Sequence, residues 1–213
     1  MLDTYKFIEK YKRISIIGME KNVGKTTLLN KLIADIGTNK KLGLTSIGRD
    51  GEDIDVVTNT DKPRIYVRRG SIIATGRNCL AKCDITKEIL YVTDFTTPMG
   101  SIVIVRALSD GYVDIAGPSY NKQVKIVVEL MEKFGSEISI VDGALGRKST
   151  AISDVSEATI LSTGAALSLD MLKVVEETKK TVYFLKLDEA EKNIKDRVEE
   201  LRDKKAVLFY KNG

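Results

Sequence analysis

Residues 13–47 constrain the fold of this chain more than any other part of it. The run RISII at 13–17 is apolar and short, which is typical of a buried parallel strand. A glycine-containing loop follows, and then TTLLNKLIADIG at 26–37 places leucine and isoleucine at helical spacing before a terminal glycine. The run LGLTSI at 42–47 predicts the next strand. Strand, loop, helix and strand make a βαβ unit, so we expect an α/β fold of three layers around a mostly parallel sheet.

The loop after the first strand, GMEKNVGKTT at 18–27, has the composition of a phosphate-binding loop. Backbone N–H groups at a helix N-terminus bind phosphate oxygens, and the helix dipole favours negative charge there. The lysine of such a loop reaches the β and γ phosphates, and the hydroxyl after it binds Mg²⁺. We therefore predict that ATP and Mg²⁺ bind here, with Thr26 as a metal ligand. The predicted nucleotide-binding residues are Gly18, Asn22, Val23, Gly24, Lys25, Thr26 and Thr27.

The spacing of this loop departs from the usual G-x4-G-K-[ST], because five residues separate Gly18 from Gly24. The longer form, GMEKNVGKT, resembles the Walker A motif of dethiobiotin synthetase and its relatives. Those relatives include ATP-dependent synthetases, and proteins in which an extra lysine of the loop reaches across a dimer. Glu20 stands at the position of that lysine, so the resemblance does not extend to it.

Two later segments supply candidate carboxylates for Mg²⁺. Residues 138–143, ISIVDG, form an apolar strand with Asp142 at its carboxyl end, where open α/β sheets bind ligands. The second strand leads into GRDGED at 48–53. In the P-loop branch that the loop after the first strand resembles, an aspartate after the second strand lies near the γ-phosphate, so the resemblance makes Asp50 the first candidate to hold metal or orient water, with Glu52 as the second. Lys25, Asp50 and Asp142 are thus the predicted catalytic residues. An Asp-Gly turn at 142 and a solvated acidic turn near 50 remain the alternatives.

The middle of the chain, residues 64–116, has the pattern of antiparallel strands. Short β-rich runs occupy 64–75, 88–95 and 101–107, and Asp110-Gly111 is a hairpin signal before YVDIA. We expect this block to extend one edge of the sheet and to offer a surface to a partner.

The alternating pattern returns after residue 118. We predict helices at 119–134, 165–179 and 188–203, and strands at 137–141, 158–161, 181–185 and 206–210. The whole chain, 1–213, is interpreted as a single domain. Because a last parallel strand normally feeds another element, truncation at the C-terminus is an open alternative. Lys186-Leu187-Asp188 after the predicted strand 181–185 resembles a guanine-reading motif, but Leu185 replaces its asparagine, so we favour ATP over GTP.

Composition excludes several classes of function. The chain has no histidine, so catalysis through a histidine base or an imidazole metal ligand is excluded. Its net charge of +4 is scattered rather than gathered into a stripe, which argues against nucleic-acid binding. No apolar run is long enough to span a membrane. Cys79 and Cys83, spaced C-x3-C, are expected to be ordinary reduced cysteines of a cytoplasmic protein.

Taken together, four segments resemble the small subunit of the lysine aminomutase reactivase family. They are RISIIGMEKNVGKTT, LTSIGRDGE, PRIYVRRGSIIATG and IVDGALGRKS, and they span roughly residues 12–150. The resemblance implies a cytoplasmic ATP hydrolase that works with a MutS-like ATPase subunit on an adenosylcobalamin-dependent aminomutase. In this interpretation, residues 143–150 form the moving loop.

Two other functions remain open at this stage. One is an ATP-dependent small-molecule synthetase related to dethiobiotin synthetase. The other is a slow nucleotide-gated binding module or metallochaperone, which the lack of histidine disfavours. A homodimer is an open alternative for the assembly.

Overall fold

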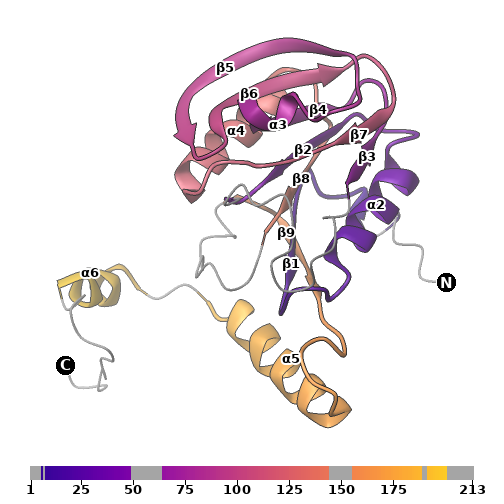
Figure 1. Cartoon of the computed structure of the whole chain (residues 1–213). Coiled ribbons are helices and arrows are strands. Elements are labelled where there is room, and N and C mark those ends of the chain that lie inside the picture. Colours follow the sequence, from indigo (N-terminus) through magenta and orange to yellow (C-terminus); the bar gives the residue numbers. More distant parts are fainter. Residues whose placement is uncertain (1–5, 7, 49–63, 144–154, 189–190, 201–213) are drawn as a thin grey trace. The chain divides into compact units, whose positions relative to one another are not determined.

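A computed structural model describes residues 6, 8–48, 64–143, 155–188 and 191–200. The chain divides into two compact units, Met1–Val175 and Glu176–Gly213, which we describe separately. The first unit holds all the strands of the described residues and confirms the expected α/β class (Figure 1). No helix in the described part of the chain is both long enough and apolar enough to cross a membrane.

The first unit is built on a seven-stranded sheet with the order β5-β6-β4-β2-β8-β1-β9. The four pairings from β4 to β9 are parallel, whereas β6 and β5 run antiparallel at one edge. This confirms the mostly parallel sheet and its antiparallel extension. The strands are β1 (Arg13–Gly18), β2 (Leu42–Ser46), β4 (Ile72–Gly76), β5 (Lys87–Thr97), β6 (Gly100–Ala107), β8 (Ile138–Asp142) and β9 (Ala158–Ser162).

One detail of the middle block differs from expectation. The strand after Asp110-Gly111, β7 (Gly111–Val113), does not form a hairpin with β6. It pairs antiparallel with β3 (Ile65–Val67) in a separate two-stranded sheet. The expected hairpin is therefore wrong, because Asp-Gly indicates a chain reversal but does not determine which strand receives the pairing.

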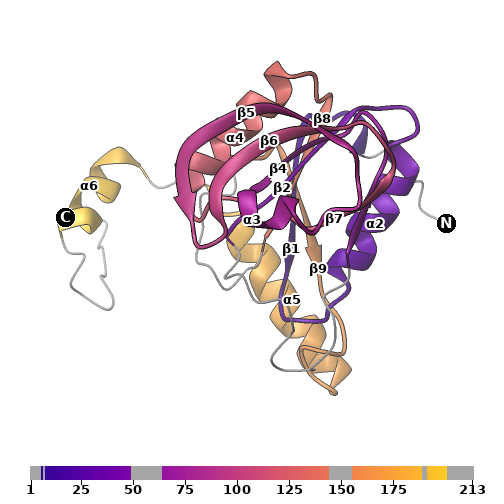
Figure 2. The same cartoon turned by 45° about the horizontal axis from the view of Figure 1, so that its top comes forward.

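Helices cover the two faces of the sheet. The α2 helix (Lys25–Ile36) buries Leu29, Leu32, Ile33 and Ile36 in one apolar cluster with alternate residues of β1. The α4 helix (Asn121–Lys133) buries Val124, Val127, Val128 and Met131 in a second cluster. Neighbouring strand residues enter different clusters, as Val103 and Ile104 do, because side chains alternate across a sheet. Figure 2 shows the strands between α2 and α4, which confirms three layers.

The C-terminal elements correct part of the sequence prediction. The α5 helix (Met171–Leu185) includes residues 181–185, so the strand predicted there is wrong. A five-residue apolar run does not distinguish a strand from a helical turn, and no glycine or proline interrupts the helix before it. Ion pairs of Lys180 with Glu176 and Glu177 add helical i,i+4 and i,i+3 contacts. The α6 helix (Lys192–Glu200) agrees with the predicted 188–203, whereas the predicted strand 206–210 lies outside the described residues.

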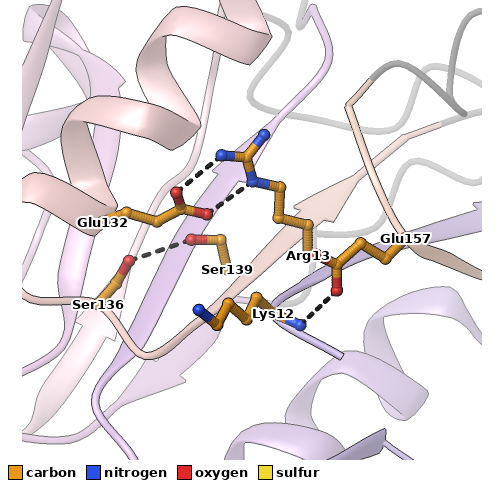
Figure 3. A network of polar contacts seen from close by, with 6 residues as sticks. All are labelled: Lys12, Arg13, Glu132, Ser136, Ser139 and Glu157. Carbon is orange, nitrogen blue, oxygen red and sulfur yellow. Dashed lines mark hydrogen bonds and ion pairs between the residues drawn. The ribbon is translucent and has the colours of Figure 1, made fainter. Parts of the chain in front are cut away.

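A polar network joins β1 to α4 at the amino end of the sheet (Figure 3). The Arg13 guanidinium donates two hydrogen bonds to the Glu132 carboxylate, at 2.7 and 2.8 Å. These hydrogen bonds raise the pKa of Arg13 above its usual value. Both side chains are about a quarter exposed, so water screens the pair only in part. This pair of hydrogen bonds, which we name the fork, fixes the start of β1 against α4.

We expect Glu132→Gln to lower the free energy of unfolding by about 1 kcal/mol, because a charged fork is replaced by weaker neutral contacts. Urea denaturation monitored by circular dichroism measures this change. Glu129→Gln is the matched control, since Glu129 is exposed on the same helix and acts on Arg13 through charge alone, without the two hydrogen bonds. Equal losses in the two variants would contradict a specific contribution from the fork.

Candidate functional site

The loop between β1 and α2 has the backbone shape of an anion-binding turn. Asn22 and Gly24 both adopt left-handed conformations, with φ of 61° and 85°, and Val23 between them does not. Alternation of right- and left-handed residues curls successive N–H groups toward one point, where an anion can bind. Gly24 is the N-cap of α2, and a residue with a Cβ would be strained at its φ.

The first turn of α2 leaves this point available to an anion. No side chain caps the helix, and its first turn contains no acidic residue. The first backbone bond across the cap runs from Leu28 N to Gly24 O, at 2.9 Å. Within the described part of the chain, the N–H groups of residues 23–27 have no hydrogen-bond acceptor. A helix N-terminus of this kind favours negative charge through its dipole and its unsatisfied donors.

Gly18 lies directly against the side chain of Lys25. A Cβ placed on Gly18 would lie 2.7 Å from Cδ of Lys25 and 2.8 Å from Cγ2 of Val23. The stem of Lys25 therefore runs directly over Gly18, although five residues separate Gly18 from Gly24. Gly18 and Lys25 are therefore in close contact across the five-residue interval.

The head group of Lys25 lies beside the end of β8. Its Nζ donates a hydrogen bond of 2.8 Å to the carbonyl of Gly143 and lies 3.7 Å from Oδ1 of Asp142. Both charged side chains are about a quarter exposed. Parallel pairing of β1 with β8, in which Ile16 aligns with Asp142, brings the two residues to the same edge of the sheet. Two residues predicted separately from sequence are thus adjacent.

The remaining predicted residues divide into two groups. Thr26 is half-buried and Thr27 is exposed in the first turn of α2. Asp50, Glu52 and the loop residues 144–150 lie outside the described residues, so the structure says nothing of their positions. The described chain enters the 49–63 segment at Gly48, whose N–H donates to the carbonyl of Pro118 at 2.9 Å.

Sequence reasoning missed the hydroxyl contacts that shape this edge of the sheet. Ser46 Oγ accepts a hydrogen bond from Gly117 N at 2.9 Å, and Thr75 Oγ1 accepts one from Ala116 N at 2.9 Å. Each hydroxyl also donates to a carbonyl of the same segment, at Ile115 and Asp114. Residues 114–118, which we name the strap, are thereby fixed across the carboxyl ends of β2 and β4. Small hydroxyl residues near strand ends are the only sequence signal, and it is too common to identify such a contact.

The cysteines do not form a site in the described structure. Cys79 is buried with Met99 and Ala116. Cys83 packs against the apolar cluster that contains the buried residues of α2, which we name the α2-side cluster. Burial raises the pKa of the Cys83 thiol, which lowers its reactivity. Within the described residues, no group of three or more Cys, Asp or Glu side chains could hold a metal ion by itself.

The guanine-reading interpretation of Lys186-Leu187-Asp188 loses its structural basis. That motif was expected to follow a strand, but it follows α5, and Lys186 N still donates to Val182 O at 3.2 Å as in a helix. Leu187 and Asp188 are exposed.

Comparisons with protein-family models, with curated proteins and with solved structures found no match to this chain. The interpretation of the site therefore depends on its own geometry and on the sequence motif.

We expect Gly18→Ala to displace Lys25 while leaving the fold intact, because the added methyl group meets side-chain atoms of Lys25 and Val23 rather than backbone, and the lysine is the more flexible of the two. Amine labelling followed by mass spectrometry should show a several-fold rise in Lys25 reactivity relative to Lys21 in the same molecule. The accompanying loss of stability should be about 1 kcal/mol. Gly164→Ala is the control, since its Cβ would meet nothing within 4 Å. Unchanged Lys25 labelling would contradict the close packing described above.

Proposed function

We propose that this chain binds ATP with Mg²⁺ at the loop 18–27 and hydrolyses it. The observation that carries the proposal is the position of Lys25, whose ammonium lies 3.7 Å from the Asp142 carboxylate above an anion-binding turn. A cation, a carboxylate and a row of N–H donors at one sheet edge are the parts that nucleoside triphosphate sites require.

The residues present fit a magnesium ion. Mg²⁺ prefers oxygen ligands and keeps several waters, so it is usually held by one or two carboxylates together with substrate phosphates. The described residues offer the Thr26 hydroxyl and the Asp142 carboxylate, which suits this habit better than a cage made only of protein ligands. Asp50 remains a proposed third contributor outside the described residues. When bound, the ion would neutralise charge on the β and γ phosphates.

The proposed chemistry needs no histidine. Phosphoryl transfer depends mainly on positioning and on electrostatic stabilisation of the transferring group. The N–H groups of residues 23–27 would bind the phosphate oxygens, and Lys25 would leave the Gly143 carbonyl to contact the terminal phosphates. Asp142 would then hold the metal or the attacking water, as expected from sequence.

We further propose that nucleotide turnover acts on a protein rather than on a metabolite. The resemblance to the aminomutase reactivase supports this, with a MutS-like ATPase subunit and an adenosylcobalamin-dependent aminomutase as partners. Exposed aromatic side chains in the middle block also support it, since Tyr66 and Tyr112 stack edge to face at 5.3 Å and remain 39% and 45% exposed. Tyrosine is enriched at protein interfaces because it offers apolar area and a polar tip.

We expect Lys25→Ala to weaken ATP binding by about 100-fold, or roughly 2.7 kcal/mol, because the charged contact with the phosphates is lost. Isothermal titration calorimetry with Mg²⁺ and a non-hydrolysable ATP analogue measures this change. Lys21→Ala is the matched control, since it removes the same charge from the same loop, and its affinity should stay within a few-fold of the unmodified protein. An unchanged affinity in Lys25→Ala would overturn the nucleotide site.

The client is tested separately. An adenosylcobalamin-dependent aminomutase inactivated by bound, damaged cobalamin should recover activity with this chain, the MutS-like subunit and ATP. Recovery should be absent with Lys25→Ala. If ATP binds but no aminomutase recovers, the reactivase role is wrong and the nucleotide site stands. A product that incorporates a metabolite at the expense of ATP would instead favour the synthetase alternative.

A further inference from the structure

The β5 strand forms an open edge of the sheet. It is the last strand in the order β5-β6-β4-β2-β8-β1-β9, and at eleven residues it is longer than the others (Figure 1). Among the described strands, only β6 pairs with it. Its apolar side chains Ile89, Tyr91 and Val92 are 63%, 46% and 54% exposed. Proteins usually shorten or charge such edges, because unpaired N–H and C=O groups there accept another strand.

The main-chain groups that face the open edge can be identified from the ladder with β6. Leu108 N donates to Thr86 O at 2.8 Å, so Thr86 directs its groups toward β6. Directions alternate along a strand, and Lys87 and Ile89 therefore face outward. A bulge between Ile89 and Tyr91 inserts one residue, which makes Val92 the next outward residue.

This bulge makes the edge complementary to itself. Outward residues lie at 87 and 89 before the bulge and at 92 after it. In an antiparallel pair with a two-fold axis between residues 90 and 91, Ile89 of one copy lies opposite Val92 of the other. Both copies carry the same bulge, so Ile89 meets Val92 on either side of the axis. A second irregularity between Val92 and Thr96 limits the regular ladder to this segment. In a strand without a bulge, the outward residues would all be odd-numbered or all be even-numbered. Such a strand could not place an outward residue 89 opposite an outward residue 92.

Side chains support the same register. Ile89 and Val92 align with Val105 and Val103, which belong to the α2-side cluster, so their pairing would extend one apolar layer across the axis. Tyr91 lies on the opposite face, where its ring is 6.4 Å from that of Phe134.

The charges near the axis point to a second copy rather than to an unrelated strand. Beyond this paired segment, Lys87 of one copy approaches the exposed Asp94 of the other, and this attraction is made twice. Asp94 lies within a second irregularity of β5, between Val92 and Thr96, so the contact is one between side chains rather than a rung of a regular ladder. In the single chain Lys87 Nζ donates to Leu80 O at 2.8 Å, and the ammonium would turn from that carbonyl to the carboxylate. Shifting the axis onto Tyr91 would instead place Glu88 opposite Asp94 and repel. Isologous contacts of this kind close after two copies.

We infer that the chain forms a homodimer through antiparallel pairing of two β5 strands, centred between Leu90 and Tyr91, so that the two sheets become one continuous sheet. The inference is independent of nucleotide binding, because β5 contributes no residue to the proposed site.

Sedimentation equilibrium over a series of concentrations tests the dimer. The unmodified chain should sediment as a dimer in reversible equilibrium, and Val92→Lys should sediment as a monomer because it places an unpaired ammonium in the apolar centre. Ile126→Lys is the matched control, since Ile126 is an exposed apolar residue on α4, and it should remain dimeric. Far-UV circular dichroism verifies that each variant is folded. A monomeric unmodified chain, or a dimeric Val92→Lys, would overturn the inference.

A charge swap tests the register itself. Asp94→Lys should raise the dimer dissociation constant about tenfold, because Lys87 then faces lysine at both ends of the ladder. Adding Lys87→Asp to this variant should restore the affinity, since each pair becomes attractive again. Failure of the double variant to recover would show that the strands do not meet in this register.

Discussion

The parallel pairing of β1 with β8 is the constraint on which the rest of the candidate site depends. It aligns Ile16 with Asp142, so the loop after β1 and the carboxylate at the end of β8 share one edge of the sheet. The hydrogen bond from Lys25 to the Gly143 carbonyl then connects the start of α2 to the end of β8. Parallel strands direct their carboxyl ends to the same side, and this explains why Lys25 and Gly143, which are 118 positions apart, meet.

The strap, residues 114–118, connects the middle block to the carboxyl ends of β2 and β4. Ser46 and Thr75, at or near the ends of β2 and β4, each donate one hydrogen bond to the strap and accept one from it. These hydroxyls are almost completely buried, where an unpaired polar group would be costly, so the strap is favoured in one position. Pro118, at its end, accepts from Gly48 and so fixes where the chain leaves the sheet after β2.

The sheet has two very different edges. At one edge, β5 and β6 are antiparallel and β5 exposes apolar side chains. At the other, β9 pairs only with β1 among the described strands, and its residues are mostly half-buried. The proposed nucleotide site lies between these edges, so a contact at β5 would leave the Lys25 region accessible. The proposed dimer and the proposed nucleotide binding are therefore compatible in one molecule.

Sequence periodicity predicted most of the first unit because its signals are local. The apolar run before Gly18, the helical spacing after Lys25 and the strand before Asp142 each depend on neighbouring residues. The failures concern features that local pattern cannot determine. Residues 181–185 have a strand composition but continue α5, and Asp110-Gly111 reverses the chain without pairing its flanking strands.

The sequence by itself determined the α/β class, the position of the loop 18–27 and the lack of histidine chemistry, because each follows from residue identity and short-range spacing. Only the tertiary structure decided that Lys25 packs over Gly18, that Asp142 lies beside it, and that the strap binds Ser46 and Thr75. It also decided which strand stands open at the edge and where its bulge falls. These features depend on strand order and register, which arise from contacts between segments far apart in the chain and leave no local mark in the sequence.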